Sequence, residues 1–256
     1  MYQKKMELIN RRGQKIAAEI FVPGQEGEEK KYPTVIFSHG FGGNYRLLHH
    51  HGPGYAEAGI VCMFFDFCGG GMDSLSQGSM RAMTIPTEQA DLEDVIKFTK
   101  DLPYVDGENF FLQGESMGGF VTAHLLGQKE LPVKGQILWY PAFVIPDDSQ
   151  KRFDMDRYDL GGLVLSADYN ETAMNINIFE EIKATRVPTL LIHGDRDELV
   201  PIAYSRRAHE LYPNSEFIVL SEAGHGFEGE DSQRARQESI NFILKHVAGE
   251  GRDQEC

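Results

Sequence analysis

The sequence has little cysteine and little positive charge, and each shortage argues against a class of protein. Its three cysteines are Cys62, Cys68 and Cys256. Their odd number and unpaired spacing argue against a disulfide framework and against a zinc site. Cys62 and Cys68 fall in an apolar run and are expected to be core thiols. The chain carries 25 Lys and Arg against 39 Asp and Glu, a formal net charge of −14. This balance argues against binding to nucleic acid or to an anionic membrane surface.

Long apolar runs are also missing. The run from Ile60 to Phe67 is far too short to cross a bilayer. The stretch Met1–Glu7 has no apolar signal core. We therefore expect a cytoplasmic protein without membrane association. A length of 256 residues, with 41% of them hydrophobic, suits one large domain with a sizeable core.

The sequence does contain a regular alternation of short apolar runs and helical patterns. An antiparallel hairpin over residues 4–22 is expected to open the sheet. The further strands are expected at Thr34–Phe37, Val61–Phe67, Asn109–Gln113, Gly135–Tyr140, Thr189–Ile192 and Glu216–Leu220. Helices are expected to end near Gly59, to span Thr87–Lys100, to follow Ser116, and to span Ile202–Leu211 and Ser232–His246. Repeated strand–helix units predict an α/β fold, a mostly parallel twisted sheet with helices on both faces. The polar tail Gly249–Cys256 is expected to fray.

A serine lies between one expected strand and the helix that follows it. The turn that carries it is Gly114-Glu115-Ser116-Met117-Gly118-Gly119. This order is that of the nucleophile elbow of α/β-hydrolases, in which a strained turn lifts the serine clear of the sheet. Side chains at Gly114 and Gly118 would collide where strand and helix pack closely. An isolated match of this kind is weak evidence, so the partners of Ser116 decide its meaning.

An acyl-transfer serine needs a base and an acid that orients the base, and both are expected after it in the chain. His225 stands between two glycines directly after the last expected strand, and it is the base that we predict. The acid is expected in His193–Pro201, after the preceding strand. We favour Asp197, at the tip of that turn, over Asp195, which is nearer the strand and is expected to brace the turn.

Two backbone N–H groups are expected to stabilise the oxyanion. We predict those of Met117, just after the serine, and Phe41, in the glycine-rich loop that follows the Thr34–Phe37 strand. His39 belongs to the same loop. We expect it to brace the loop, and we count it among the residues near the substrate.

Two other patterns could suggest a bound metal or phosphate. Adjacent histidines do not converge on one ion, so His49-His50-His51 is expected to lie on the surface or to line an access channel. The run Gly69-Gly70-Gly71 lacks the Lys-Ser/Thr of a P-loop and the spacing of a dinucleotide fingerprint. The sequence therefore implies no metal and no cofactor.

One segment interrupts the alternation. No strong strand occurs between Tyr140 and Val187, where a polar run, a candidate hairpin arm at Gly161–Leu165 and a helical pattern at Glu171–Lys183 follow one another. Insertions of this length are usually functional. This one follows the strand after the elbow, so we interpret residues 142–186 as a lid over the serine, within one domain that spans residues 1–256. The alternative is an insertion that only caps the sheet.

Taken together, these motifs resemble the α/β-hydrolase superfamily and, within it, the bacterial feruloyl (cinnamoyl) esterases. The residues that carry the resemblance are Ser38–Asn44, Phe65–Gly71 with Ser74 and Gly78, Gly114–Gly119, His193–Pro201 and Ala223–Phe227. The resemblance implies that the lid forms an apolar slot for the ring of a hydroxycinnamate. It suggests as slot residues Trp139, Phe143, Phe153, Tyr158 and Tyr169, with Asp147 or Asp148 bonding a phenolic hydroxyl. Each of these aromatic residues has the alternative of being plain lid core.

We therefore expect a serine carboxylesterase that acts on small-molecule esters, above all on hydroxycinnamate esters of sugars or quinate, by a Ser-His-Asp acyl-enzyme mechanism. One alternative is another serine acyl hydrolase on the same fold, such as a peptidase or a thioesterase. Another is a catalytically inactive binding protein, which the intact set of motifs disfavours. The sequence leaves open whether the chain forms a homodimer.

Overall fold

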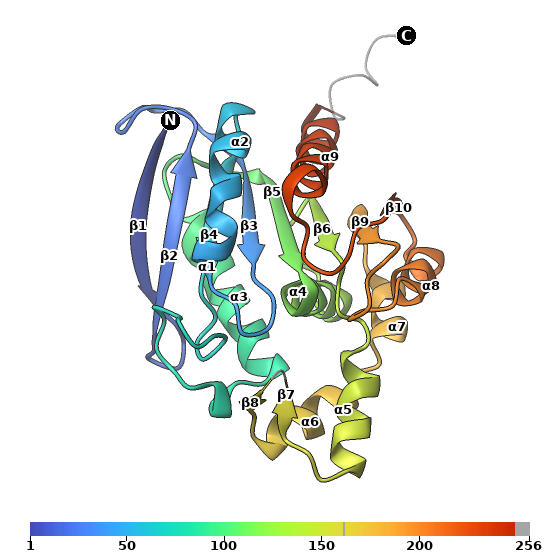
Figure 1. Cartoon of the computed structure of the whole chain (residues 1–256). Coiled ribbons are helices and arrows are strands. Elements are labelled where there is room, and N and C mark those ends of the chain that lie inside the picture. Colours follow the sequence, from blue (N-terminus) through green and yellow to red (C-terminus); the bar gives the residue numbers. More distant parts are fainter. Residues whose placement is uncertain (161, 249–256) are drawn as a thin grey trace.

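An eight-stranded, mostly parallel sheet forms the centre of the molecule (Figure 1). The structure is a computed structural model that describes residues 1–160 and 162–248. The strand order is β1-β2-β4-β3-β5-β6-β9-β10. Strand β2 runs antiparallel to β1 and β4, and every other neighbouring pair in this sheet is parallel. The strands are β1 (Tyr2–Ile9), β2 (Lys15–Val22), β3 (Tyr32–Ser38), β4 (Val61–Phe65), β5 (Val105–Glu115), β6 (Gly135–Trp139), β9 (Thr189–Gly194) and β10 (Ser215–Leu220).

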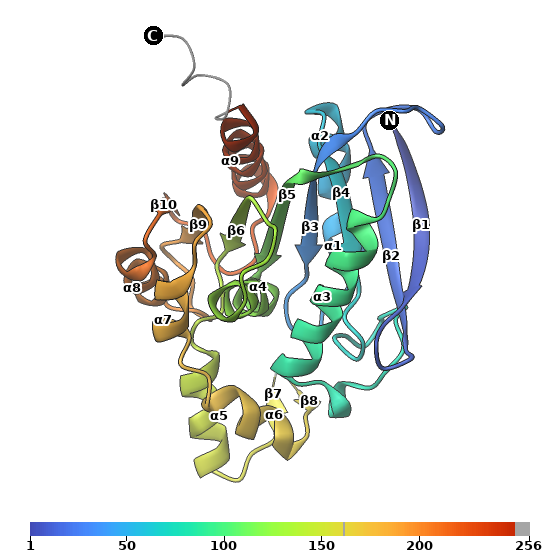
Figure 2. The same ribbon diagram turned by 180° about the vertical axis from the view of Figure 1, so that it is seen from behind.

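Helices cover both faces of this sheet, which confirms the predicted α/β fold. One face is covered by α1 (Tyr45–Leu48), the short helix η1 (His49–His51), α2 (Gly52–Glu57) and α9 (Gly229–Ala248). The other face is covered by α3 (Ile85–Lys100), α4 (Ser116–Gln128) and α8 (Ala203–Leu211), with α3 in front in the reverse view of Figure 2. Another short helix, η2 (Met80–Ala82), precedes α3. No helix within the described residues is long and apolar enough to span a bilayer.

The pleat of the strands divides the apolar side chains between two cores. In β4, Met63 and Phe65 belong to the core beneath α3 and α4, whereas Cys62 and Phe64 belong to the core beneath α2 and α9. Successive side chains of a strand point to opposite faces, so a strand buried on both faces needs an uninterrupted apolar sequence. The buried, free thiols of Cys62 and Cys68 confirm that these residues are core thiols.

The element boundaries differ from the expected ones at a few places. Strand β4 ends at Phe65, two residues before the predicted end, and β6 ends at Trp139. Tyr140 leaves the strand with φ 35, a backbone conformation that residues other than glycine rarely adopt. The tail 249–256 lies outside the described residues.

The segment between β6 and β9 begins as a layer beyond the carboxyl ends of the parallel strands, and its last two helices return to pack against α4 (Figure 1). Its elements are α5 (Ile145–Asp154), β7 (Asp159–Leu160), β8 (Leu163–Val164), α6 (Ala167–Met174), α7 (Ile178–Glu181) and η3 (Ile182–Ala184). Strands β7 and β8 pair in the predicted hairpin arm, although residue 161 lies outside the described part.

The sequence explains where the helices of this segment begin and end. The polar run after Pro146 forms α5, with Asp147 and Asp148 in its first turn and Lys151 and Arg152 in its last, an order that favours the helix dipole. The prediction of one helix over Glu171–Lys183 is wrong. Helix α6 ends before Asn175, and Asn177 adopts a non-helical ψ of 71 before α7. Asparagine side chains compete for backbone hydrogen bonds and so favour helix ends.

Candidate active site

Ser116 occupies a strained turn between β5 and α4. Its φ is 49, although a serine rarely adopts a positive φ. A Cβ atom at Gly114 would lie 2.3 Å from the carbonyl oxygen of Gly118, and a Cβ atom at Gly118 would lie 2.2 Å from that of Ser38. Neither position therefore has room for a side chain, as the motif predicts for a nucleophile elbow.

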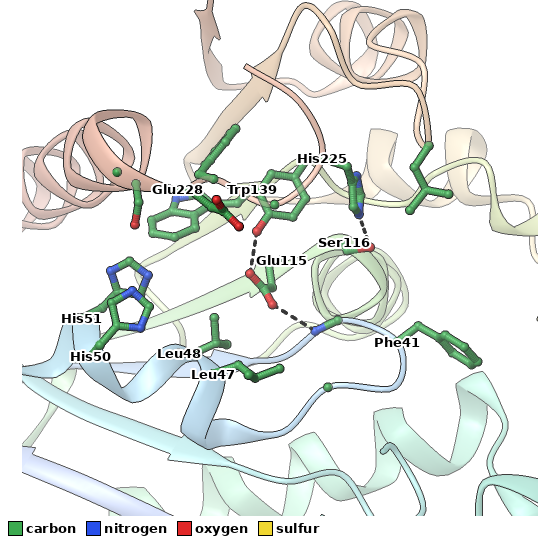
Figure 3. Close-up of a pocket in the computed structure, with 18 residues that line it drawn as sticks. Phe41, Leu47, Leu48, His50, His51, Glu115, Ser116, Trp139, His225 and Glu228 are labelled. Atoms are coloured by element: carbon green, nitrogen blue, oxygen red, sulfur yellow. Dashed lines mark hydrogen bonds between the residues drawn. The ribbon is translucent and has the colours of Figure 1, made fainter. Parts of the chain in front are cut away.

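The structure brings together the three residues that the sequence singles out, Ser116, His225 and Asp197. The Oγ of Ser116 lies 2.9 Å from Nε2 of His225 (Figure 3), and Nδ1 of His225 lies 2.8 Å from Oδ2 of Asp197. Since a carboxylate can only accept, Nδ1 carries the proton and Nε2 is free to accept the hydroxyl proton of Ser116. This arrangement can remove a proton from the serine and hold the resulting imidazolium.

Asp197 is held in its ionised form by its surroundings. Burial alone would raise the pKa of this carboxyl, but hydrogen bonds from His193, His225 and the N–H of Val200 outweigh burial and lower it. The Nε2 of His193 lies 3.1 Å from Oδ2 of Asp197 and 2.9 Å from the carbonyl oxygen of Val200. Both neighbours of Nε2 are acceptors, so that nitrogen carries the proton. The sequence does not predict that His193 contacts Asp197, because this contact depends on the geometry of the turn between them.

Asp195 takes the bracing position expected for it. Its Oδ1 accepts a hydrogen bond of 2.7 Å from the N–H of Glu222, which ties the turn after β9 to the loop that carries His225. A Cβ atom at Gly194 would lie 2.2 Å from the carbonyl oxygen of Ala223, so these two loops pack backbone against backbone. The relative positions of Asp197 and His225 are fixed by this contact.

The two expected oxyanion donors lie in one cavity wall with the serine. Phe41 and Met117 both line a cavity that includes Ser116. Met117 stands in the first turn of α4, where backbone N–H groups have no acceptor within the helix. Among the described residues, no acceptor is paired with the N–H of Phe41. Both groups are therefore free to bind a negatively charged oxygen.

His39 braces the Phe41 loop from below and does not reach the substrate space. It is fully buried, its Nε2 accepts a hydrogen bond from the N–H of Phe67, and its Nδ1 donates to the carbonyl oxygen of Gly40. Burial lowers the pKa of this imidazole, so it stays neutral. The structure therefore supports the bracing role and corrects the expectation that His39 lies near the substrate.

A carboxyl group that the sequence analysis overlooked lies beside the nucleophile. Glu115 accepts a hydrogen bond of 2.5 Å from the hydroxyl of Tyr140 and one of 3.4 Å from the N–H of Gly40 (Figure 3). The ring of Tyr140 meets that of His225 edge to face, with centroids 4.7 Å apart. Glu115 thus connects the Phe41 loop with the aromatic ring that packs on the imidazole. Burial raises its pKa, although these hydrogen bonds and the nearby imidazole oppose the shift.

Two cavities meet at Ser116. The smaller, of about 190 Å³, lies beneath the inserted segment and is lined by Ile145, Leu160 and Tyr169 among others. The larger, of about 650 Å³, extends from His225 to the end of η1 and is lined by Glu115, Trp139 and Glu228 among others. Ser116 and Phe41 line both cavities, so a substrate bound at the serine can occupy both.

Only part of the expected slot lines the smaller cavity. Tyr169 and Asp148 line it, and Arg152, which the sequence did not indicate, does so too. Trp139 lines the larger cavity instead, with its Nε1 donating to Ser239. Three other aromatic residues and one acid line neither cavity: Phe143, Phe153, Tyr158 and Asp147. Phe143 is buried against Phe120 and Phe179, Asp147 accepts from the hydroxyl of Tyr204, and Tyr158 bonds Asp156.

Two of the three adjacent histidines lie together, contrary to the expectation that adjacent histidines do not converge: the ring centroids of His50 and His51 are 4.0 Å apart. His49 bonds Glu19, whereas His50 and His51 line the larger cavity. His51 is buried, stacks on Phe37 and meets Trp139 edge to face. The access-channel alternative therefore describes His50 and His51 better than a surface position.

Comparison with known proteins identifies the family of this chain. The family model described as "Serine aminopeptidase, S33" matches residues 29–157, half of the chain, and a model described as "TAP-like protein" matches residues 170–256. The chain belongs to this family of α/β-hydrolases. The non-heme chloroperoxidase CPO-A1 of Kitasatospora aureofaciens is 33% identical over 69 residues, which are 26% of this chain and 25% of that protein. The match thus spans about a quarter of the length of that relative.

Solved structures show the same fold over nearly the whole α/β-hydrolase chain. Est1E from Butyrivibrio proteoclasticus, solved with ferulic acid bound, superposes with a TM-score of 0.83 at 24% identity, covering 95% of this chain and 99% of that one. An esterase from Exiguobacterium antarcticum superposes with a TM-score of 0.72 at 18% identity, covering 94% and 100%. The family assignment makes this protein a hydrolase, and the solved structures show that it shares the fold of Est1E.

Proposed function

We propose that this α/β-hydrolase is a serine carboxylesterase in which Ser116 is the nucleophile, His225 the base and Asp197 the acid that orients it. The observation that carries the proposal is the continuous line of hydrogen bonds from Asp197 through His225 to Ser116, at the point where two cavities meet. A base that faces a hydroxyl and has a carboxylate behind it is the arrangement that activates a nucleophile.

The mechanism follows from the direction of these bonds. His225 takes the proton of Ser116 as Oγ attacks the ester carbonyl, and the N–H groups of Phe41 and Met117 stabilise the oxyanion. His225 then gives the proton to the leaving alcohol, which departs from the acyl-enzyme. Water activated by the same imidazole releases the carboxylic acid. The ionised Asp197 stabilises the imidazolium at both stages.

We further propose that the inserted segment, residues 142–186, is a lid and that the smaller cavity beneath it holds the acyl group. A cavity of about 150 Å³ accommodates a benzene ring, so about 190 Å³ suits a ring with a short side arm. Tyr169, Ile145 and Leu160 supply apolar walls, and Asp148 supplies an acceptor for a phenolic hydroxyl. The likeness to Est1E with ferulic acid bound supports a hydroxycinnamoyl group here.

The test is hydrolysis of an ester panel by the purified protein, beside Ser116→Ala and the exposed control Ser221→Ala. We expect turnover of p-nitrophenyl esters, methyl ferulate and chlorogenate, a loss of about a million-fold in kcat for Ser116→Ala, and an unchanged rate for the control. A fluorophosphonate probe should label the wild type and the control only. Ester turnover that survived in Ser116→Ala would refute the mechanism. A folded wild type that neither turned over esters nor took the label would indicate an inactive binding protein.

A second candidate function is cleavage of peptide bonds, because the matching family model is described as a serine aminopeptidase. The same triad can attack an amide. Aminoacyl anilides in the panel separate the two functions, since a kcat/KM for anilides above that for esters of the same acyl group would favour the peptidase. An acyl thioester in the same panel tests the thioesterase alternative.

A further inference from the structure

The two cavities differ in which catalytic groups they contain, and this identifies their roles if the proposed ester hydrolysis holds. His225 lines the larger cavity and not the smaller, whereas Met117 lines the smaller and not the larger. The imidazole must reach the leaving oxygen in order to protonate it. The leaving alcohol therefore extends into the larger cavity, and the acyl group into the smaller.

The larger cavity carries negative charge without a facing cation. Glu115 and Glu228 line it, and no Lys or Arg does so within the described part of the chain. Besides His225, the lining groups that could carry positive charge are the imidazoles of His50 and His51. The guanidinium of Arg236 on α9 acts on the charge of His51 but does not line this cavity. The smaller cavity, by contrast, contains both Asp148 and Arg152.

His51 does not supply the missing positive charge. Burial lowers its pKa to about 3, with smaller contributions from His50 and Arg236, so its imidazole is neutral at physiological pH. Its Nδ1 is buried and has no hydrogen-bond partner among the described residues. A neutral imidazole with a nitrogen left unpaired at the end of a cavity points to a ligand or a water that completes it.

Aromatic rings line the same space. Trp139 and Phe227 lie with centroids 5.9 Å apart, and Tyr140 meets Phe227 edge to face at 4.6 Å. All three line the larger cavity, with Glu115 and Glu228 beside them (Figure 3). Aromatic surfaces combined with carboxylates are a general way to bind ammonium groups, since both attract a cation and neither requires the cation to donate a hydrogen bond.

We propose that the larger cavity is a subsite for leaving groups that carry a positive charge, namely amino alcohols and quaternary ammonium alcohols, and that it disfavours anionic ones. Within the proposed esterase function, this narrows the alcohol half of the substrate. It also predicts that chlorogenate, whose quinate carries a carboxylate, is a poorer substrate than an uncharged ester of a comparable acid.

The experiment compares three esters of one acid, chosen as the acyl group that the p-nitrophenyl panel shows to be cleaved fastest. The alcohols are choline, its uncharged isostere in which a carbon atom replaces the nitrogen, and a hydroxy acid of similar length. At pH 8, where imidazoles as a class are neutral, we expect kcat/KM for the choline ester to exceed that for the isostere by about tenfold. A unit charge pair at about 4 Å in water contributes a factor of about five. A second carboxylate would add to this factor, whereas solvent screening reduces the contribution of the exposed Glu228.

Glu228→Lys tests the source of the preference, and Glu230→Lys is the matched control. Both side chains are exposed, are two residues apart and undergo the same change of charge, but only Glu228 lines the cavity. We expect the choline-to-isostere ratio to fall to about one or below in Glu228→Lys and to stay near the wild-type value in Glu230→Lys. Raising the salt concentration should lower the wild-type ratio.

The outcomes separate this inference from the function on which it rests. If the wild type cleaves the isostere at least as well as the choline ester, the charged subsite is refuted while the esterase function stands. If both lysine variants lower the ratio equally, the preference comes from the overall charge of the protein, and the subsite is refuted as well. If none of the esters is cleaved, the esterase function fails and this inference fails with it.

Discussion

Glu115→Gln should lower the pH at which activity is lost on the acidic side. Glutamine has nearly the shape of glutamate, so its oxygen can still accept from the N–H of Gly40 and its amide can donate to the hydroxyl of Tyr140. The substitution therefore removes the negative charge and keeps the hydrogen bonds. The carboxylate of Glu115 and a protonated His225 attract each other, so removing the charge should take away a stabilising interaction of the imidazolium.

The expected size of this shift follows from the geometry. The Oε1 of Glu115 and the Oγ of Ser116 both lie 3.7 Å from the point where a Cβ atom of Gly40 would stand, so the carboxyl is close to the triad. In general, two unit charges about 7 Å apart interact by about 1 to 2 kcal/mol at an effective dielectric constant between about 20 and 40. Since about 1.4 kcal/mol corresponds to a tenfold change in proton affinity, an interaction of that size would move the acidic limb of the activity profile by about one pH unit.

The assay is the pH dependence of kcat/KM for an uncharged ester, whose acidic limb reports the imidazole of the free enzyme. We expect this limb to move down by about one pH unit in Glu115→Gln while the plateau at higher pH changes less than about fivefold. Glu222→Gln is the matched control, because Glu222 is exposed, pairs with Arg196 and lies on the same loop as His225. An acidic limb that stayed at its wild-type position in Glu115→Gln would show that Glu115 exerts no electrostatic effect on the imidazole.

Three further predictions concern other buried groups. Asp197→Asn should lower kcat by about ten thousand-fold, because an amide no longer holds His225 in the tautomer that accepts the serine proton; stopped-flow ester hydrolysis measures it, and a loss under tenfold would contradict the assigned role. Glu88 is fully buried without a hydrogen-bond partner among the described residues, and burial, with Asp91 second, raises its pKa well above the ordinary value. A carboxyl whose pKa is raised by folding stabilises the protein at low pH, and this contribution is lost as pH rises through the folded pKa. Urea unfolding should therefore show that the stability of Glu88→Gln relative to wild type increases from pH 5 to pH 8. The same difference in unfolding free energy between variant and wild type at both pH values would count against this. Gly118→Ala should cost more than about 2 kcal/mol of unfolding free energy or displace the elbow, because its Cβ atom would lie 2.2 Å from the backbone oxygen of Ser38; a thermal melt and an ester assay unchanged from wild type would refute this.

The sequence predicted the parts of the site that depend on local order along the chain. Ser116, Asp197 and His225 each follow a parallel strand, and the carboxyl ends of parallel strands meet at one edge of the sheet. Their convergence could therefore be inferred without knowing any side-chain contact. The need for glycine at the elbow could also be predicted from the sequence, because a backbone that packs this closely leaves no room for a side chain.

The features of the site that the sequence did not predict depend on contacts between distant elements, or on which face of a strand a side chain occupies. Glu115 forms hydrogen bonds with Gly40 and Tyr140, which belong to other loops. No spacing in the sequence predicts these two hydrogen bonds. Trp139 was assigned to the lid side, yet it shares a strand face with Ile137 and so belongs to the core beneath α9, opposite Leu138. The alternation of side chains in β6 was a usable signal for this, and the error lay in grouping Trp139 with the insertion that follows it.

The two cavities are built by different segments, and this separation bears on how specificity arises. The walls of the smaller cavity come largely from the insertion, through Ile145, Leu160 and Tyr169, whereas the larger cavity is closed by η1 and by the residues that precede α9. The shared wall is the elbow and the Phe41 loop, which Gly114 and Gly118 hold in a packing that admits no side chain. Changes in one segment can therefore alter the acyl or the alcohol preference without moving the reacting atoms, and energetic effects at sites that share no partners are usually additive. By this reasoning, the chemistry resides in a wall that has no room for an added side chain at Gly114 or Gly118, and the substrate preferences reside in the segments around it.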